Sequence, residues 1–186
     1  MPLAICGIPE LPDALKPPVS HVISFLDPTM PEPRALDVWP KEKRHLFRYD
    51  DICEATPGMT MPDEALIADL VRTFDKIIAE KPERLLIHCH AGRSRSTATG
   101  MIWLWYRHLH SGPALADALL ALRPGAWPNT LILSMADRLL GAKGVLEEAG
   151  RIVHRRTARE DLLFTDWLAT TRRREEVLAA REAGVD

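Results

Sequence analysis

An apolar run that ends at a glycine-containing loop is the feature that most constrains the fold of this chain. The segment LLIHCHAGRSRSTATG (85–100) begins with three consecutive large apolar residues and continues into small and hydroxyl residues. Such a run is typical of a central parallel strand that is buried on both faces. Gly92 permits a tight turn, and a helical pattern follows from Arg95. A strand, a short loop and a helix in this order indicate an α/β protein.

The rest of the chain repeats this alternation of strands and helices. Apolar runs bounded by proline or acidic residues predict further strands at 2–7, 21–27 and 44–51, beside the strand at 84–89. Helical spacing of apolar residues predicts helices at 60–81, 95–110, 114–125 and 130–141. Asn129 is expected to cap the helix at 130–141, and Thr157 with Glu160 predicts a capping box before a final charged helix. We therefore expect a central, mostly parallel sheet flanked by helices, with a C-terminal helical extension.

Charge and cysteine content restrict the partners and the compartment. The chain has 24 basic and 26 acidic residues among 186, so no general basic field favours nucleic acid. No apolar run is long enough to span a bilayer, and the N-terminus lacks the positive region of a signal peptide. Cys6, Cys53 and Cys89 are an odd set without metal-type spacing, so a disulfide framework is not expected. These features predict a cytoplasmic protein that binds neither membrane nor nucleic acid.

Cys89 ends the strand at 84–89, six residues before Arg95. Sites in α/β proteins form beyond the carboxyl ends of the strands. A loop that closes onto a helix N-terminus directs backbone N–H groups at one point and favours both an oxyanion and a thiolate. Arg95 can contact two phosphate oxygens with its planar guanidinium, and the Ser96 hydroxyl can donate to the sulfur. This pattern predicts transfer of a phosphoryl group to sulfur.

The stretch HCHAGRSRS (88–96) matches H-C-x5-R-[S/T] and resembles the signature loop of the cysteine-dependent protein tyrosine phosphatases. The short chain is most similar to their dual-specificity branch. The likeness extends more weakly over residues 3–140, including RPGAWPNTLILSMADRLL (123–140). It implies a phosphatase-like domain at 1–144, followed by a helical extension at 145–186 that packs on or trails the same domain.

The resemblance also implies roles for individual residues. Cys89 would be the nucleophile that forms a cysteinyl-phosphate, Arg95 would bind phosphate, and Ser96 would ease departure of the thiolate. His88 would orient the loop, and Asn129 would support the site as a structural cap. The phosphate oxygens would be held by the backbone of the intervening residues His90, Ala91, Gly92, Arg93 and Ser94. The Arg93 side chain either lines the rim and favours an acidic substrate or is simply solvated.

The family supplies its general acid from an aspartate upstream of the cysteine. Trp39 and Pro40 are followed by Lys41, so the Trp-Pro-Asp spelling is absent. Asp50 and Asp51 end a predicted strand, whereas Asp63 lies in the first turn of a predicted helix, where the helix dipole alone explains an acid. We expect Asp51 to be the acid, with Asp63 and Asp50 as alternatives.

These residues predict a phosphatase that acts on phosphotyrosine, with phosphoserine and phosphothreonine as further substrates, through a cysteinyl-phosphate. A phosphorylated protein or a small phosphate ester is the expected partner, and no metal or cofactor is expected. The alternatives are a phosphoinositide, RNA 5′-phosphate or metabolite substrate, a non-catalytic phospho-ligand-binding domain, and a thiol sulfurtransferase.

Overall fold

Four parallel strands form one sheet in the order β1-β4-β2-β3. The computed structural model describes residues 2–16 and 18–183. The strands are β1 (Leu3–Gly7), β2 (Val19–Leu26), β3 (Arg44–Arg48) and β4 (Arg84–Cys89). β4 lies between β1 and β2, as its unbroken apolar run predicts, and Gly7 of β1 pairs with Cys89. The expected α/β architecture with a parallel sheet is confirmed.

Successive residues of β4 point to opposite faces of the sheet and enter different cores. Leu85, Ile87 and Cys89 face the larger core, which contains the apolar sides of most helices. Leu86 faces a smaller core on the other side, together with Cys6 of β1. The strand is therefore buried on both faces, and Cys89 points toward the side that carries the long helices.

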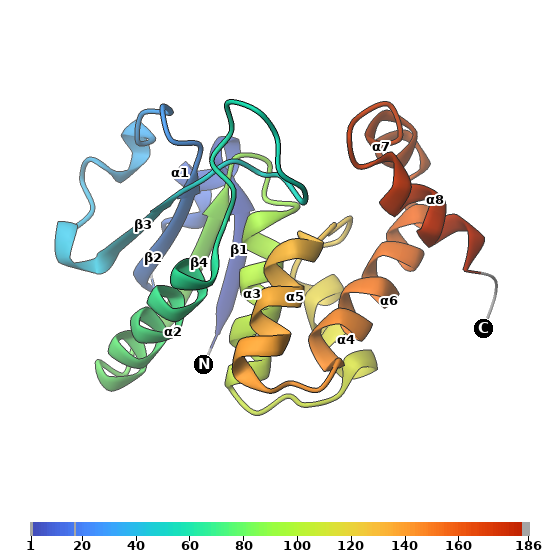
Figure 1. The fold of residues 1–186 in the computed structure, drawn as a ribbon. Coiled ribbons are helices and arrows are strands. Elements are labelled where there is room, and N and C mark those ends of the chain that lie inside the picture. The colour runs from blue at the N-terminus through green and yellow to red at the C-terminus, as the bar shows by residue number, and fades with distance from the viewer. Residues whose placement is uncertain (1, 17, 184–186) are drawn as a thin grey trace.

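The helices divide unequally between the two faces of the sheet (Figure 1). The smaller face is covered by short elements, namely η1 (Ile8–Glu10), α1 (Leu11–Ala14), η2 (Arg34–Leu36) and the neighbouring η3 (Lys41–Lys43). The larger core holds α2 (Glu64–Ala79), α3 (Arg95–Tyr106), α4 (Gly112–Leu122), α5 (Thr130–Leu140) and α6 (Val145–Glu160). Beyond α6 lie α7 (Leu162–Leu168) and α8 (Arg174–Glu182). This arrangement leaves the carboxyl ends of the strands open to the loops and to the last two helices.

Several element boundaries differ from the sequence-based expectation. α2 begins at Glu64 and not at residue 60, because the Asp63 side chain accepts a hydrogen bond from the Leu66 N–H and acts as the N-cap. β3 ends at Arg48, short of the two aspartates, and α3 ends at Tyr106. The N-cap of α5 matches the prediction, since the Asn129 side chain accepts from the Ile132 N–H, and Gly141 ends the helix in a left-handed conformation.

The predicted capping box at Thr157 and Glu160 is wrong. Both residues belong to the last turn of α6, where the Thr157 hydroxyl donates to the Ala126 carbonyl. The cap of the next helix is Asp161, whose side chain accepts from the Phe164 N–H. Apolar residues of α6 enter the larger core, while α7 and α8 bury Leu168 and Val177 around Trp127. The division of the chain at residue 144 stays a prediction.

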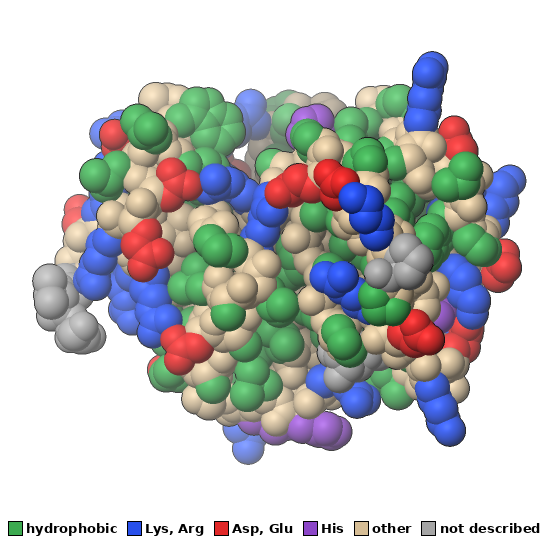
Figure 2. Space-filling model, turned by 180° about the vertical axis from the view of Figure 1, so that it is seen from behind, with side chains coloured by type: hydrophobic (Ala, Val, Ile, Leu, Met, Phe, Trp, Pro, Cys, Tyr) green, Lys and Arg blue, Asp and Glu red, His purple; other side chains and the backbone are tan. Residues whose placement is uncertain are grey.

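Charges of both signs are interspersed on the face seen in Figure 2, in keeping with a net charge of −2. Within residues 2–16 and 18–183, none of the helices combines the length and the apolar character needed to cross a membrane.

Candidate active site

The loop between β4 and α3, here called the cysteine loop (residues 88–96), owes its path to Gly92. This residue has φ +70°, which favours glycine over residues with a side chain. A Cβ atom at Gly92 would also lie 2.4 Å from both the Cys6 carbonyl carbon and the Gly7 nitrogen. The loop therefore folds directly against the end of β1, where only a glycine fits.

The carbonyl oxygens of residues 90–94 in the cysteine loop all accept hydrogen bonds from surrounding segments. Their donors are the backbone N–H groups of Ile8, Trp127, Asn129 and Ala98, the Thr97 hydroxyl and the Arg123 guanidinium. Among the described residues, no hydrogen bond is donated by the backbone N–H groups of residues 90–94. A loop whose carbonyl oxygens are hydrogen-bonded to surrounding segments, and whose N–H groups have no partner, has the properties of a backbone nest. Such nests bind anions.

Cys89 lies at the base of this nest. Its side chain is buried, and its sulfur lies 3.1 Å from the Ser96 hydroxyl oxygen at the start of α3. A hydroxyl at this distance can donate a hydrogen bond to a thiolate. The structure thus brings together the two residues that the sequence placed seven positions apart.

Arg95 is the most buried cation of the site, with 2% of its side chain exposed. Its Nη1 donates to the Tyr49 carbonyl at 2.6 Å and lies 2.7 Å from an Asp27 carboxylate oxygen. Its Nε–H is buried and has no partner among the described residues. These contacts fix one edge of the guanidinium and leave a donor for a bound anion. Asp27 was missed in the sequence, where its only signal is its place just after β2.

The three candidate acids have different surroundings. One Asp51 oxygen accepts hydrogen bonds from the Ser94 hydroxyl at 2.7 Å and from the Asn129 amide at 2.9 Å. Asp50 instead accepts from the Thr60 N–H at 2.7 Å, and Asp63 caps α2. Of these carboxylates, Asp51 is the one whose side chain bonds to the cysteine loop. Asn129, which was expected only as a cap, also holds this carboxylate.

His88 points away from the nest, to the opposite face of the sheet from Cys89. Its Nε2 and the Ser24 hydroxyl of β2 share a hydrogen bond at 2.6 Å. Burial lowers the pKa of His88 to about 4, so the imidazole is neutral near pH 7. The exposed His90 lies at the start of the loop. Among the described residues, no three His, Cys, Asp or Glu side chains gather where they could hold a metal ion.

The Arg93 side chain is partly exposed and lines a cavity beside the loop, and its charge is paired within the protein. Its Nη1 donates to an Asp161 oxygen at 2.7 Å and to the Gly125 carbonyl at 3.0 Å. Its guanidinium also lies over the Phe164 ring, 4.1 Å from the ring centroid. The charge of Arg93 is thus paired with the N-cap of α7 and stacked on Phe164, while a role in favouring an acidic substrate stays a prediction.

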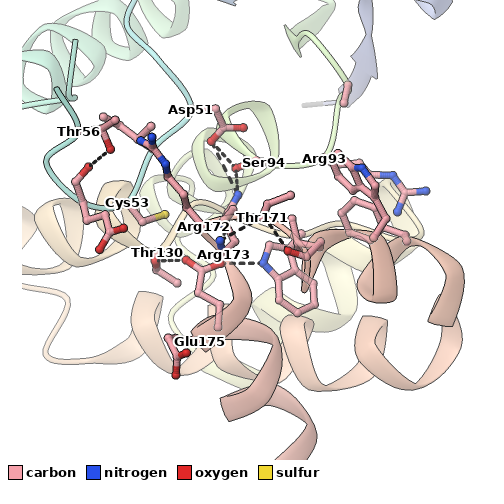
Figure 3. Close-up of a pocket in the computed structure, with 18 of the residues that line it drawn as sticks. Asp51, Cys53, Thr56, Arg93, Ser94, Thr130, Thr171, Arg172, Arg173 and Glu175 are labelled. Carbon is pink, nitrogen blue, oxygen red and sulfur yellow. Dashed lines mark hydrogen bonds and ion pairs between the residues drawn. The ribbon is translucent and has the colours of Figure 1, made fainter. Parts of the chain in front are cut away.

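Arg173, at the N-terminus of α8, is a part of the site that sequence reasoning missed. Its Nη1 donates to the Ser94 hydroxyl at 2.7 Å and lies 3.8 Å from the nearer Asp51 oxygen. Figure 3 shows Arg173 reaching from α8 toward both residues. The expected C-terminal extension thus contributes a cation to the edge of the cysteine loop.

Glu176 holds Arg173 in this position. Its carboxylate accepts from Arg173 Nε at 2.8 Å, from Trp127 Nε1 at 2.8 Å and from the Thr130 hydroxyl at 2.6 Å. Burial would raise the pKa of Glu176, but the charge of Arg173 and these hydrogen bonds lower it to about 2. An ionised Glu176 and Arg173 therefore form an ion pair with little exposure beside the site.

The other two cysteines are free thiols. Burial raises the pKa of Cys6 to about 12, and burial also raises that of Cys53. Raised values favour the protonated and less reactive thiol.

Comparison with known proteins finds similar structures but no similar sequences. No model of a known protein family matches the chain, and no curated protein matches it by sequence. Solved structures do match. PTP-2 phosphatase of Cydia pomonella is 21% identical with a TM-score of 0.57, over 74% of this chain and 85% of that one.

Two further phosphatase structures are similar. Human DUSP28 is 19% identical with a TM-score of 0.53, over 76% of this chain and 94% of that one. PTPMT1, solved in complex with PI(5)P, is 19% identical with a TM-score of 0.52, over 80% of this chain and 94% of that one. The chain has the fold of the dual-specificity and protein tyrosine phosphatases.

Proposed function

We propose that this protein hydrolyses phosphate monoesters through a cysteinyl-phosphate intermediate. The observation that carries the proposal is the surroundings of Cys89. Its sulfur lies 3.1 Å from the Ser96 hydroxyl, and neither the N–H groups of residues 90–94 nor the Nε–H of the buried Arg95 has a partner in the part of the chain that the structure describes. A site with these donors stabilises both a thiolate and the charge that develops on a transferring phosphoryl group.

In the first step the Cys89 thiolate attacks phosphorus, and the bond between phosphorus and the ester oxygen breaks. Asp51 gives its proton to the departing oxygen, so the alcohol leaves neutral. The backbone of residues 90–94 and Arg95 hold the three non-bridging oxygens. Asp51 suits this role because its hydrogen bonds to Ser94 and Asn129 hold it at the edge of the loop.

In the second step water attacks phosphorus, and the bond between sulfur and phosphorus breaks. Asp51, now ionised, accepts the proton of the water. Ser96 donates a hydrogen bond from its hydroxyl to the departing thiolate and keeps its proton. The products are inorganic phosphate and the starting enzyme, so no cofactor is consumed. Aryl esters such as phosphotyrosine are the proposed substrates, with phosphoserine and phosphothreonine as further ones.

The test is hydrolysis of 4-nitrophenyl phosphate by the purified protein in the presence of a metal chelator. Cys89→Ser should abolish turnover, because a serine hydroxyl is a far weaker nucleophile than a thiolate. Cys6→Ala, which removes a buried thiol with no proposed role, should retain turnover. Activity that survives in Cys89→Ser, or that is absent from the wild-type protein, would refute the proposal.

A further inference from the structure

A cavity of about 510 Å³ opens beside the cysteine loop, and the proposed chemistry assigns it no role. Its walls come from residues 51–59, from the edge of the loop at Ala91 and Ser94, and from α7 and α8 (Figure 3). Volumes of this size are typical of sites for small organic ligands and exceed what one phenyl ring occupies. The cavity is therefore large enough for a bulky substituent next to the phosphate.

The lining is mostly apolar and aromatic, contributed by Ile52, Met59, Trp127, Phe164, Trp167 and Leu168. Two of these side chains are widely exposed, since Trp167 is 61% and Met59 46% exposed. Arg172 Nη1 lies 4.0 Å from the Met59 sulfur, so residues 51–59 approach the start of α8. Exposed apolar side chains around a cavity are typical of a binding site for an apolar group.

The cavity adjoins the residue that we assign as the acid. Asp51 and Ser94 both line it, and they are joined by a hydrogen bond of 2.7 Å. Since the acid must protonate the departing oxygen, the alcohol portion of the substrate has to lie on the side that Asp51 faces. The cavity occupies that side.

The charges of the lining argue against a ligand with several phosphates. The acidic residues are Asp51, Glu54, Glu175 and Glu176, against the basic Arg93, Arg172 and Arg173. Arg93 is already paired with Asp161, and Arg173 with Glu176. Among the described residues, the lining arginine without a carboxylate partner is Arg172, whose Nη1 lies 4.0 Å from the Met59 sulfur. A polyphosphorylated headgroup needs several unpaired cations, and one arginine does not supply them.

We propose that this cavity is a leaving-group pocket, and that among the phosphate monoesters that the site hydrolyses the preferred substrate is a small ester of an apolar alcohol bulkier than one phenyl ring. The proposal rests on the phosphatase activity proposed above. It makes Trp167 of α7 and Met59 specificity-determining residues, and it gives the C-terminal helices a part in choosing the substrate.

The experiment compares 2-naphthyl phosphate with phenyl phosphate, whose phenols have similar acidity, so that the ratio of kcat/KM reports the second ring. The wild-type protein should favour the naphthyl ester by about tenfold or more. Trp167→Ala and Met59→Ala should each reduce this ratio toward one. Inhibition by inorganic phosphate should stay unchanged, because the cysteine loop holds it.

Leu163→Ala is the matched control, since Leu163 is 87% exposed on the same helix as Trp167 and does not line the cavity. This variant should keep the wild-type ratio. A ratio near one in the wild-type protein, or one that both pocket variants leave intact, would overturn the inference while the phosphatase activity stands. Higher kcat/KM for an inositol polyphosphate or a phosphotyrosine peptide would overturn it as well. A wild-type protein without turnover on every ester would refute the proposed function, and this inference with it.

Discussion

At the scale of single residues, the direction of one carboxylate distinguishes Asp51 from its neighbour. Asp51 accepts hydrogen bonds from Ser94 and Asn129, whereas Asp50 accepts from the backbone of Thr60 and so braces its own loop. A general acid contributes most where the leaving group is too basic to depart without a proton. The two aspartates should therefore respond differently when each is changed to asparagine.

Asp51→Asn should slow hydrolysis of phenyl phosphate by ~10²–10⁴-fold, the usual contribution of general acid catalysis. The loss should be much smaller for 4-nitrophenyl phosphate, whose phenol is strongly acidic. The alkaline limb of the pH–rate profile should also flatten in this variant. Steady-state kinetics with both esters across the pH range measure these effects.

Asp50→Asn and Asp63→Asn are the controls for this prediction. Each removes a carboxylate that bonds to backbone, so any loss should be similar for the two esters. If the loss depends on the leaving group in either control and not in Asp51→Asn, that control residue is the general acid.

The residues of the cysteine loop were predictable because they are close in sequence and their chemistry depends on that spacing. The Cys89 sulfur and the Ser96 hydroxyl lie 3.1 Å apart, and the adjacent Arg95 is buried. Asp27 and Arg173 were not predictable, because tertiary contacts alone bring them to the loop. Arg173 lies 79 residues from the serine to which it donates, in a segment without a motif.

At the scale of elements, helix starts were the least predictable feature. The sequence pattern predicted a capping box at Thr157 and Glu160 before the final helix. The structure uses Asp161 instead, because Thr157 is buried in α6 and donates to the Ala126 carbonyl. Packing of α6 against the core thus overrode the local signal.

The placement of α8 leads to a prediction about Arg173. Arg173→Met leaves the carboxylate of Glu176 buried without its cation, and breaking a buried ion pair in this way costs about 3–5 kcal/mol of unfolding free energy. Hydrolysis of phenyl phosphate should also fall by about 10–100-fold, because Ser94 and Asp51 lose a hydrogen bond and an ion pair that position them. Urea unfolding and steady-state kinetics measure the two effects.

The double variant Arg173→Met/Glu176→Gln distinguishes the effect of Arg173 on the positions of Ser94 and Asp51 from its effect on stability. It removes both charges, so most of the stability should return, while the introduced glutamine can accept from Trp127 Nε1 with its carbonyl oxygen and donate to the Thr130 hydroxyl with its NH2 group. Activity should stay low. If activity recovers together with stability, Arg173 supports only the fold.

At the scale of the whole molecule, the α/β architecture followed from the order of strands and helices, while the fold's response to pH depends on buried histidines. His45, His88 and His154 lie in separate parts of the chain, and burial lowers the pKa of each to about 4. In the unfolded chain a histidine binds its proton near pH 6.5. Between these values the unfolded state therefore binds more protons than the folded state.

The free energy of unfolding should accordingly fall as the pH drops from about 6.5 toward 4. His154→Gln should make this fall shallower, since glutamine can still donate to the Pro128 carbonyl but does not titrate. Urea unfolding at several pH values from 7 to 4.5 provides the measurement. A slope that is the same in both proteins would show that His154 does not contribute to the acid sensitivity.

The late position of Arg173 in the chain has a consequence for biosynthesis. Ser94 is synthesised 79 residues before Arg173, whose guanidinium donates to the Ser94 hydroxyl. At a translation rate of ~5–20 residues per second, the interval is about 4–16 s. Folding during synthesis can therefore form the cysteine loop first, whereas Arg173, which contacts Ser94 and Asp51, is added only with α8. A ribosome that stalls between the two would display a nascent chain in which Ser94 and Asp51 lack their contacts with Arg173.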